Sequence, residues 1–228
     1  MLLIYVWRPQ NKDATTTMKS IFRNALLALA LGVATPAFAV DAPQAESSVN
    51  MATALEPGPL PEIAMGDAKG VPVIEYGSAT CSHCAHFAHD VWPAFKKDYV
   101  DTGKVRYIFR EYSRNPLDVA AFILARCKGD DKAYPTIELL LATQDKWAFV
   151  DKPLDGLVDV LRAAGFTRDQ IMECLKDQPK ADAMAKIVQT ADKEFAIKGT
   201  PTFIINGKEY GGALTEDELA AILKPLIN

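Results

Sequence analysis

The stretch "VPVIEYGSATCSHCAHFAHDVWPAF" (residues 71–95) carries the pattern on which the fold depends. It begins with a short run rich in β-branched residues, 71–76, and continues with apolar residues at helical spacing from Cys81 onward. A second β-rich run, "KVRYIFRE" (104–111), follows. We therefore expect a strand, a helix that begins near Cys81, and a second strand.

Beyond Asn115 the sequence changes to helical patterns separated by glycine, proline and charged turns. The expected helices lie within 115–127, 134–144, 153–165, 167–177 and 181–197. The segment "TPTFIINGKEYGG" (200–212) then predicts two strands around an Asn206–Gly207 hairpin turn. Thr215 and Glu218 fit a capping box that opens a final helix.

The N-terminal part has the features of a targeting segment. Residues 18–39 combine a basic start, an apolar core and a small-x-small cleavage site, which is typical of a secretory signal peptide. We expect cleavage after Ala39 and interpret residues 1–17 as a misassigned start. Residues 40–62, rich in proline and small polar residues, predict an irregular, partly mobile arm.

Charge and cysteine content limit the possible functions. The whole chain carries a formal net charge of −4, which argues against nucleic acid or an anionic membrane surface as a partner. After the signal, no segment has the roughly 18 continuous apolar residues of a membrane helix, so we expect a soluble mature protein. Four cysteines in an exported chain predict two disulfides.

The motif "TCSHC" (80–84) points to redox chemistry. Cys81 is expected at a helix N-terminus, where backbone N–H groups and a partial positive charge stabilise a thiolate and lower its pKa. Cys84 falls three residues on, nearer the core, which suits a resolving thiol. His83 between them can stabilise the thiolate further. A stabilised thiolate makes the corresponding disulfide a stronger oxidant.

Two other interpretations of the motif remain open. A zinc site would need Cys81, Cys84, His86 and His89 to converge, but on a regular helix they spread around more than half of the circumference. Two inert, buried cysteines are the other alternative, and a solvated helix face accounts for His86 and His89. We expect no metal and no other cofactor.

Pro201, in "GTPTF" (199–203), lies at the start of an expected strand, where proline removes a hydrogen-bond donor and fixes the chain. From the sequence alone an ordinary trans bond is favoured, because only about 5% of X–Pro bonds in folded proteins are cis.

The combination of these motifs resembles the DsbA family of periplasmic thiol:disulfide oxidoreductases, thioredoxin-fold proteins with an inserted helical domain. The match spans about Ile63 to the C-terminus, and stretches such as "GVPVIEYGSATCSHCAHFAH" and "GTPTFIINGK" are most similar to the alphaproteobacterial branch. The resemblance implies an α/β, thioredoxin-like fold with an inserted all-helical domain. Residues 63–114 and 198–228 would form the thioredoxin-like domain and residues 115–197 the insertion.

The resemblance also implies roles for individual residues. Cys81 would be the nucleophile that forms mixed disulfides, and Cys84 the resolving cysteine. Pro201 would be a cis proline that faces them, with Thr200 offering backbone atoms to an extended substrate strand.

Glu75 matches a family acidic residue beneath the active site that helps to move the proton of Cys84. The alternative is a strand charge that faces solvent. A further acidic residue of the best-studied member falls on Ala88 here, so the proton path departs from that pattern.

Cys127 and Cys174 both lie in the expected insertion, near the ends of two predicted helices. We favour a structural disulfide between them over two buried thiols or a second redox pair. Some alphaproteobacterial relatives carry such a second bridge, which agrees with this interpretation.

The resemblance implies a periplasmic, monomeric dithiol oxidase as the leading function. It would pass the Cys81–Cys84 disulfide to unfolded or partly folded secreted proteins with reduced cysteines, and a quinone-linked membrane partner similar to DsbB would reoxidise it. A disulfide isomerase or reductase is the alternative, because Thr200 also precedes the proline in isomerases of this superfamily. The arm before Ile63, without a dimerisation domain, argues against an isomerase. A metal-binding periplasmic protein is the third possibility.

Overall fold

The computed structural model describes residues 40–227 of the 228-residue chain. The expected signal peptide and the misassigned start therefore lie outside the described residues. Among the residues that the structure describes, no helix is long and apolar enough to cross a membrane.

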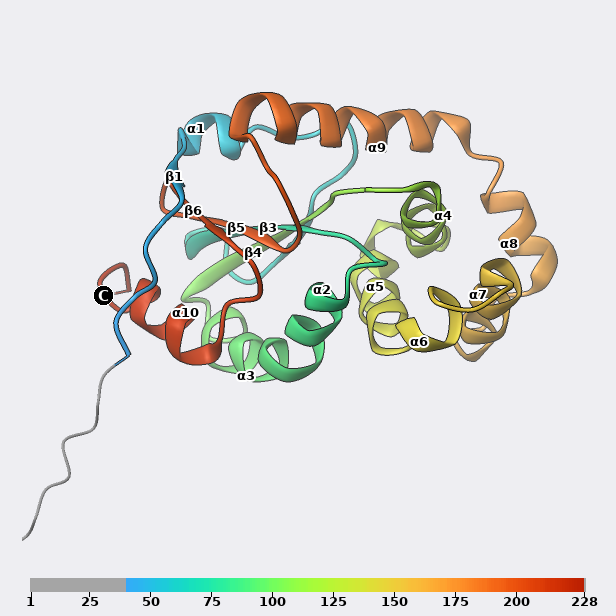
Figure 1. The fold of residues 1–228 in the computed structure, drawn as a ribbon, viewed down its shortest axis with the longest axis horizontal. Coiled ribbons are helices and arrows are strands. Elements are labelled where there is room, and N and C mark those ends of the chain that lie inside the picture. The colour runs from blue at the N-terminus through green and yellow to red at the C-terminus, as the bar shows by residue number, and fades with distance from the viewer. Residues whose placement is uncertain (1–39, 228) are drawn as a thin grey trace, which may run out of the picture. The chain divides into compact units, whose positions relative to one another are not determined.

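A six-stranded mixed sheet forms the centre of the fold (Figure 1). Its strands run in the order β1-β6-β5-β3-β4-β2, and β3 and β4 pair in parallel while the other neighbours are antiparallel. Asn206 and Gly207 join β5 to β6 and both have positive φ, as a type I′ turn requires. The bounds are β1 (Ser47–Ser48), β2 (Ile63–Met65), β3 (Val71–Gly77), β4 (Val105–Glu111), β5 (Thr202–Ile205) and β6 (Lys208–Gly211).

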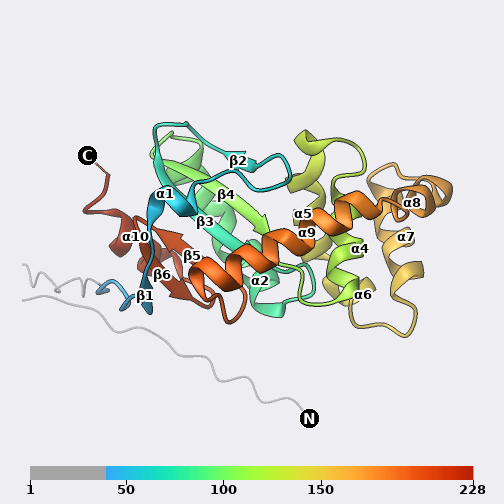
Figure 2. The ribbon, with the colours of Figure 1, turned by 90° about the horizontal axis from the view of Figure 1, so that it is seen from above.

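Helices cover both faces of the sheet and extend beyond one end of it (Figures 1 and 2). They are α1 (Met51–Ala54), α2 (Ser82–His86), α3 (Trp92–Phe95), α4 (Pro116–Ala125), α5 (Ala133–Ala142), α6 (Gln144–Trp147), α7 (Pro153–Ala163), α8 (Arg168–Cys174), α9 (Gln178–Thr190) and α10 (Glu216–Leu223). Short π-helical turns span Phe87–Val91, Lys96–Val100 and Ala191–Phe195, and a 3₁₀ turn spans Asp130–Lys132.

Side chains along β3 point alternately to the two faces of the sheet, and the interior accordingly contains two hydrophobic cores, one on each face. Val73 belongs to the larger core, which includes residues of α3, α10 and the helices that follow β4. Ile74 and Tyr76 belong to the smaller core, with Ile187 of α9 and Ala54 of α1. Figure 2 looks onto α9 as it crosses this second face.

The helix expected from Cys81 is present but not uniform. A π-helical turn, Phe87–Val91, precedes α3, and there the N–H of Trp92 bonds the carbonyl of Phe87. Pro93 follows directly and has no N–H to donate, so the wider turn accommodates it within the helix. Phe87 and Trp92 are buried against the sheet.

The arm at 40–62 is more regular than the sequence predicts. Ser47 and Ser48 pair with Glu209 and Lys208 of β6, and α1 follows, capped by the side chain of Asn50. These elements depend on partners some 160 positions away in the sequence, so a local pattern cannot reveal them. The expectation of an irregular arm is corrected accordingly.

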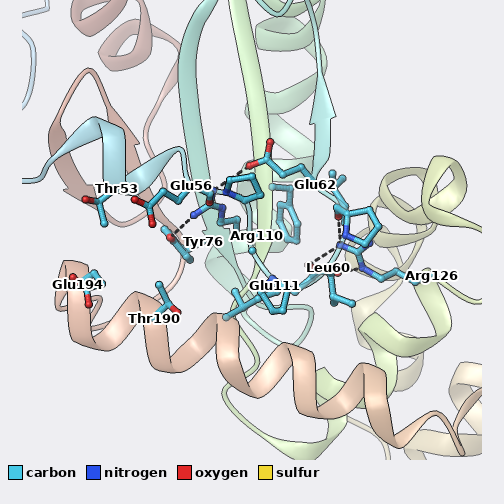
Figure 3. Close-up of a pocket in the computed structure, with 17 residues that line it drawn as sticks. Thr53, Glu56, Leu60, Glu62, Tyr76, Arg110, Glu111, Arg126, Thr190 and Glu194 are labelled. Atoms are coloured by element: carbon cyan, nitrogen blue, oxygen red, sulfur yellow. Dashed lines mark hydrogen bonds and ion pairs between the residues drawn. The ribbon is translucent and has the colours of Figure 1, made fainter.

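The end of the arm is attached to β4 by ion pairs. Glu62 accepts hydrogen bonds from Arg106 at 2.9 Å and from Arg110 at 3.1 Å. Arg110 also donates to the carbonyl of Glu56, as Figure 3 shows. Between the arm, β4 and α9 lies a cavity of about 350 Å³ that none of the predicted site residues lines.

Between β4 and β5 the chain is helical, as the sequence predicts. The last of these helices, α9, reaches from the end of α8 back to the sheet, where Ile187, Ala191 and Phe195 fill the smaller core. The segment expected as a separate insertion therefore also supplies the cover of one sheet face.

Candidate active site

The two cysteines of "TCSHC" lie at the start of α2, directly after the loop that connects it to β3. Cys81 is the N-cap residue of α2, with extended backbone angles, φ −88° and ψ 121°, and Cys84 lies in the helix itself. Both side chains are buried and both thiols are free. Cys84 has no exposed surface, whereas Cys81 retains 4%, so an incoming sulfur can approach the pair only through Cys81.

The surroundings move the pKa values of the two thiols in opposite directions. A hydrogen bond from the Cys84 thiol, helped by the backbone N–H groups of Cys84 and His83, lowers the pKa of Cys81 to about 5. Burial raises the pKa of Cys84 well above its usual value, and the thiol's hydrogen bond to Cys81 and the nearby charge of Glu75 add to this. At neutral pH the reduced pair therefore holds one thiolate, on Cys81, and one thiol, on Cys84.

The histidines of the motif point to solvent. His83 is exposed and acts on Cys81 through its backbone N–H rather than through its ring. His86 and His89 are exposed and each lies within ion-pair distance of Asp90, at 2.5 and 2.6 Å. Within residues 40–227, no group of three or more cysteine, histidine or acidic side chains could hold a metal ion.

Pro201 lies in the loop before β5, and the Thr200–Pro201 bond is cis. The trans bond that the sequence alone favours is therefore wrong at this position, and the resemblance gave the better expectation. The Cys81 sulfur lies 3.1 Å from the carbonyl oxygen of Thr200, so this loop packs directly against Cys81. The Thr200 hydroxyl is buried and has no hydrogen-bond partner within the described part of the chain.

Glu75 lies in β3 beneath the cysteines and is buried, so the solvent-facing alternative is wrong. Its carboxylate accepts a hydrogen bond from the hydroxyl of Tyr107. Burial raises the pKa of Glu75 to about 8, against the effect of this hydrogen bond, and the charge on Cys81 raises it further. A buried carboxyl group with this pKa is mostly protonated at neutral pH, which makes it a suitable proton store for a neighbouring thiol.

A buried polar cluster that the sequence did not reveal supports the turn before Cys81. The carboxylate of Asp118, on α4, accepts hydrogen bonds from the Ser78 hydroxyl at 2.9 Å and from the backbone N–H of Thr80 at 2.8 Å. The Gln144 side chain, on α6, donates to the carbonyls of Ala79 at 2.7 Å and Cys81 at 3.1 Å. The helices after β4 thus hold the backbone that positions Cys81.

One local signal could have pointed to Asp118. Asn115 caps α4, and its side chain accepts from the N–H of Asp118 at 2.9 Å. An acidic residue at the third position of a helix after an asparagine cap is a common first-turn arrangement. The pattern predicts a helix start, but it does not reveal that the carboxylate turns to the loop at residues 78–80.

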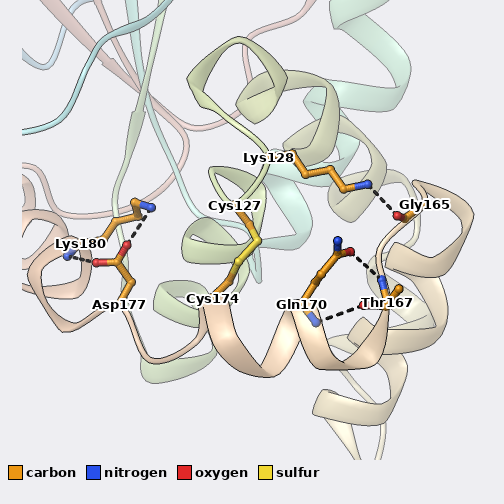
Figure 4. The surroundings of a disulfide bond; sticks show 8 residues. All are labelled: Cys127, Lys128, Gly165, Thr167, Gln170, Cys174, Asp177 and Lys180. Carbon is orange, nitrogen blue, oxygen red and sulfur yellow. Dashed lines mark hydrogen bonds and ion pairs between the residues drawn. A yellow bond between two sulfur atoms is a disulfide. The ribbon is translucent and has the colours of Figure 1, made fainter.

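Cys127 and Cys174 form a disulfide, with their Cα atoms 5.9 Å apart (Figure 4). The bond joins the turn after α4 to the last residue of α8, 47 positions further along the chain. Beside it, Lys128 donates to the carbonyls of Ala164 and Gly165 at the end of α7. Disulfide and lysine together tie three of the helices to one another.

These features define a thioredoxin-fold dithiol protein. Cys81 has a low pKa at a helix N-terminus, Cys84 lies buried three residues on, and the loop with the cis proline packs against the Cys81 sulfur. The pair follows a strand of a central mixed sheet. Comparison with known proteins agrees with this class. A family model described as Thioredoxin matches residues 60–225.

Relatives from two Rickettsia species carry the name protein-disulfide oxidoreductase. The chain is 33% identical to the one from Rickettsia conorii over 167 residues and 35% identical to the one from Rickettsia typhi over 148 residues. These matches cover 72% and 64% of this chain. The chain spans only 60% and 55% of the length of the two relatives.

Solved structures extend the comparison. Wolbachia pipientis alpha-DsbA1 is similar with a TM-score of 0.68 and 26% identity, over 74% of this chain and 92% of that one. BdbD from Bacillus subtilis shares the fold, with a TM-score of 0.63 and 20% identity over 82% and 98% of the two chains. The chain belongs to the thioredoxin family that the model describes. Within it, the chain is similar to the Rickettsia relatives and to alpha-DsbA1, in agreement with the resemblance seen in the sequence. The expected thioredoxin-like fold with inserted helices is confirmed.

The reduced protein is expected to show a thiolate that titrates near pH 5, measured by its ultraviolet absorbance. Because the pKa of Cys81 is lower in the folded chain, its contribution to stability is complete above about pH 9 and is lost as the pH falls through about 5. The stability difference between reduced and oxidised protein should therefore shrink on acidification. Cys81→Ser should abolish the absorbance step, and a midpoint at the usual cysteine value in the unsubstituted protein would contradict the expectation.

Proposed function

We propose that the protein is a thiol:disulfide oxidoreductase that donates the Cys81–Cys84 disulfide to other proteins. The observation that carries the proposal is the placement of the pair: Cys81 is the N-cap residue of α2 and lies against the Thr200 carbonyl, while Cys84 lies fully buried three residues on. The opposite pKa shifts of the two thiols agree with this placement. Stabilising the Cys81 thiolate stabilises the reduced pair, which makes the disulfide the more reactive oxidant. The names of the Rickettsia relatives and the likeness to alpha-DsbA1 support thiol:disulfide exchange as the chemistry, without assigning its direction.

In the proposed reaction, a thiolate of the client protein attacks the sulfur of Cys81. The Cys81–Cys84 bond breaks, a client–Cys81 disulfide forms, and Cys84 leaves as a thiolate that takes up a proton. A second client thiolate then attacks the client sulfur of this mixed disulfide and releases the Cys81 thiolate. The client gains a disulfide, and the two electrons remain on the enzyme as the reduced pair.

The proposed setting is the periplasm, with unfolded or partly folded secreted proteins as clients and a monomer as the working form. A membrane partner similar to DsbB, linked to quinones, would take the two electrons and restore the Cys81–Cys84 disulfide. The position of the Thr200 carbonyl, 3.1 Å from the Cys81 sulfur, supports the client part of this proposal, because a client chain that reaches Cys81 must pass beside this loop.

The test is the equilibrium of the purified protein with reduced and oxidised glutathione, with the Cys81–Cys84 pair followed separately from Cys127–Cys174. A potential of about −180 to −100 mV is expected and supports a disulfide donor. A value near or below about −250 mV would reverse the direction and make the protein a reductase. Rapid repair of scrambled disulfides, without net oxidation of reduced clients, would favour an isomerase.

A further inference from the structure

The buried carboxyl group of Glu75 has one hydrogen-bond partner within the described chain, the hydroxyl of Tyr107. Glu75 is 2% exposed and Tyr107 is fully buried, so bulk solvent does not reach this contact. The hydroxyl of Tyr134 lies 3.5 Å from that of Tyr107 and is placed to donate to it. Three side chains from β3, β4 and α5 thus form a chain of polar groups inside an otherwise apolar core.

Strand register explains how Tyr107 reaches Glu75. Val73 pairs with Tyr107 and Glu75 pairs with Phe109 in the parallel β3–β4 ladder. Tyr107 and Glu75 are therefore diagonal neighbours on the same face, a separation that a long aromatic side chain spans. Both lie on the face of the larger core, which also contains Cys84.

Within residues 40–227, the groups that face Glu75 include no cation. Cys81 and Cys84 approach from the start of α2, and Tyr107 and Tyr134 from β4 and α5. No lysine, arginine or histidine among residues 40–227 forms an ion pair with Glu75. An ionised Glu75 therefore depends on a neutral donor to offset the cost of burying its charge.

We infer that Tyr107 is a positioning residue for the proton that Glu75 exchanges with Cys84: its hydroxyl fixes the carboxyl group and stabilises the carboxylate left after the proton departs. The inference rests on the proposed function, in which Cys84 leaves as a thiolate. The carboxylic acid of Glu75 gives its proton to this sulfur and becomes a carboxylate that accepts from Tyr107. When the disulfide is formed again, the Cys84 proton returns to Glu75.

The directions of the pKa shifts agree with this exchange. The pKa of Glu75 is raised to about 8 by burial, and that of Cys84 is raised well above 9, so transfer from the carboxyl group to the thiolate is favourable. Burial and the charge of Glu75 raise the pKa of Tyr107 well above its usual value, so the tyrosine keeps its own proton and acts only as a donor.

Tyr107→Phe tests the inference, because it removes the hydroxyl and keeps the ring. The ring packs against Trp92 and Tyr134, with centroids 4.4 and 5.8 Å away, and phenylalanine retains these contacts. The measurement is the rate constant for reduction of the oxidised protein by a small dithiol across the pH range, divided by the thiolate fraction of the dithiol. For the unsubstituted protein we expect the corrected rate to fall as Glu75 loses its proton, with a midpoint above the usual carboxyl range and no higher than about pH 8, because the Cys81 charge that helps to raise the pKa of Glu75 in the reduced protein is absent from the disulfide.

In Tyr107→Phe the midpoint is expected to move up by about 1 to 2 pH units, since a hydrogen bond to a charged group is lost. Tyr99→Phe is the matched control: Tyr99 is half-buried on the surface turn Lys96–Val100 and should leave the midpoint unchanged. Glu75→Gln should remove the step. Carbon NMR of the labelled Glu75 carboxyl group gives the same midpoint without any exchange reaction.

The outcomes separate the inference from the proposed function. If Tyr107→Phe still exchanges disulfides and both the rate and the NMR measurement give an unchanged midpoint, the role of Tyr107 is overturned. The proposed oxidoreductase function is unaffected by that result. Absence of exchange in the unsubstituted protein would remove the proposed function instead. A midpoint that moves in Tyr107→Phe but not in Tyr99→Phe supports the inference.

Discussion

Cys84→Ser is expected to trap client proteins as stable mixed disulfides on Cys81, whereas Cys81→Ser is expected to reduce disulfide exchange to the background rate of the buffer. The two variants differ because only Cys81 combines a low pKa, about 5, with access from outside. Serine at position 81 has no thiolate to form the first bond, and the fully buried Cys84 cannot replace it. Without the Cys84 thiol, a mixed disulfide at Cys81 cannot be resolved from within the enzyme.

Non-reducing electrophoresis with a reduced, unfolded client checks this expectation. The matched control is the double variant Cys127→Ala/Cys174→Ala, which also removes sulfur from the chain but leaves the active-site pair intact. It should exchange at the rate of the unsubstituted protein when folded. Exchange by Cys81→Ser above background would show that a different sulfur carries the reaction.

Arg126→Leu is expected to lower the free energy of unfolding by about 3 to 5 kcal/mol, the usual cost of leaving a buried charge without its partner. Arg126 and Glu111 have side chains that are 1% and 2% exposed and are joined by two hydrogen bonds, at 2.5 and 3.0 Å (Figure 3). Arg126 also donates to the carbonyl of Pro61, so it attaches the arm as well.

Urea unfolding at neutral pH measures the effect. The double variant Arg126→Leu/Glu111→Leu should recover most of the loss, since it removes the stranded carboxylate. Arg162→Leu is the matched control, because the Arg162–Asp159 pair is exposed and should contribute less than about 1 kcal/mol. Equal losses for Arg126→Leu and Arg162→Leu would mean that the buried pair is not desolvated in solution.

Elements with a strong local pattern could be predicted from the sequence. The β-rich runs at 71–76 and 104–111, the Asn206–Gly207 turn and the capping box of α10 each depend on neighbours within a few positions. By contrast, β1 and β2 have two and three residues and exist only through pairing with β6 and β4. Short strands of this kind have no periodicity long enough to recognise.

The same contrast applies to the site. Cys81 and Cys84 could be singled out because their chemistry follows from their spacing at a helix start. Tyr107 and Asp118 could not, because a tyrosine in a strand and an aspartate in a first helical turn are ordinary residues for those positions. Their importance comes from the tertiary arrangement, which turns both side chains into the interior beneath the cysteines.

The short strand β1 has a consequence for a protein that is proposed to handle unfolded chains. A sheet margin with unpaired N–H and C=O groups invites any extended segment to dock and continue the ladder, which leads to aggregation. Ser47 and Ser48 occupy that margin of β6, and the Ser47 hydroxyl bonds the buried Glu209 side chain at 2.5 Å. Because β1 pairs with Glu209 and Lys208, an extended segment of another chain cannot continue the sheet at these two residues of β6 without displacing the arm.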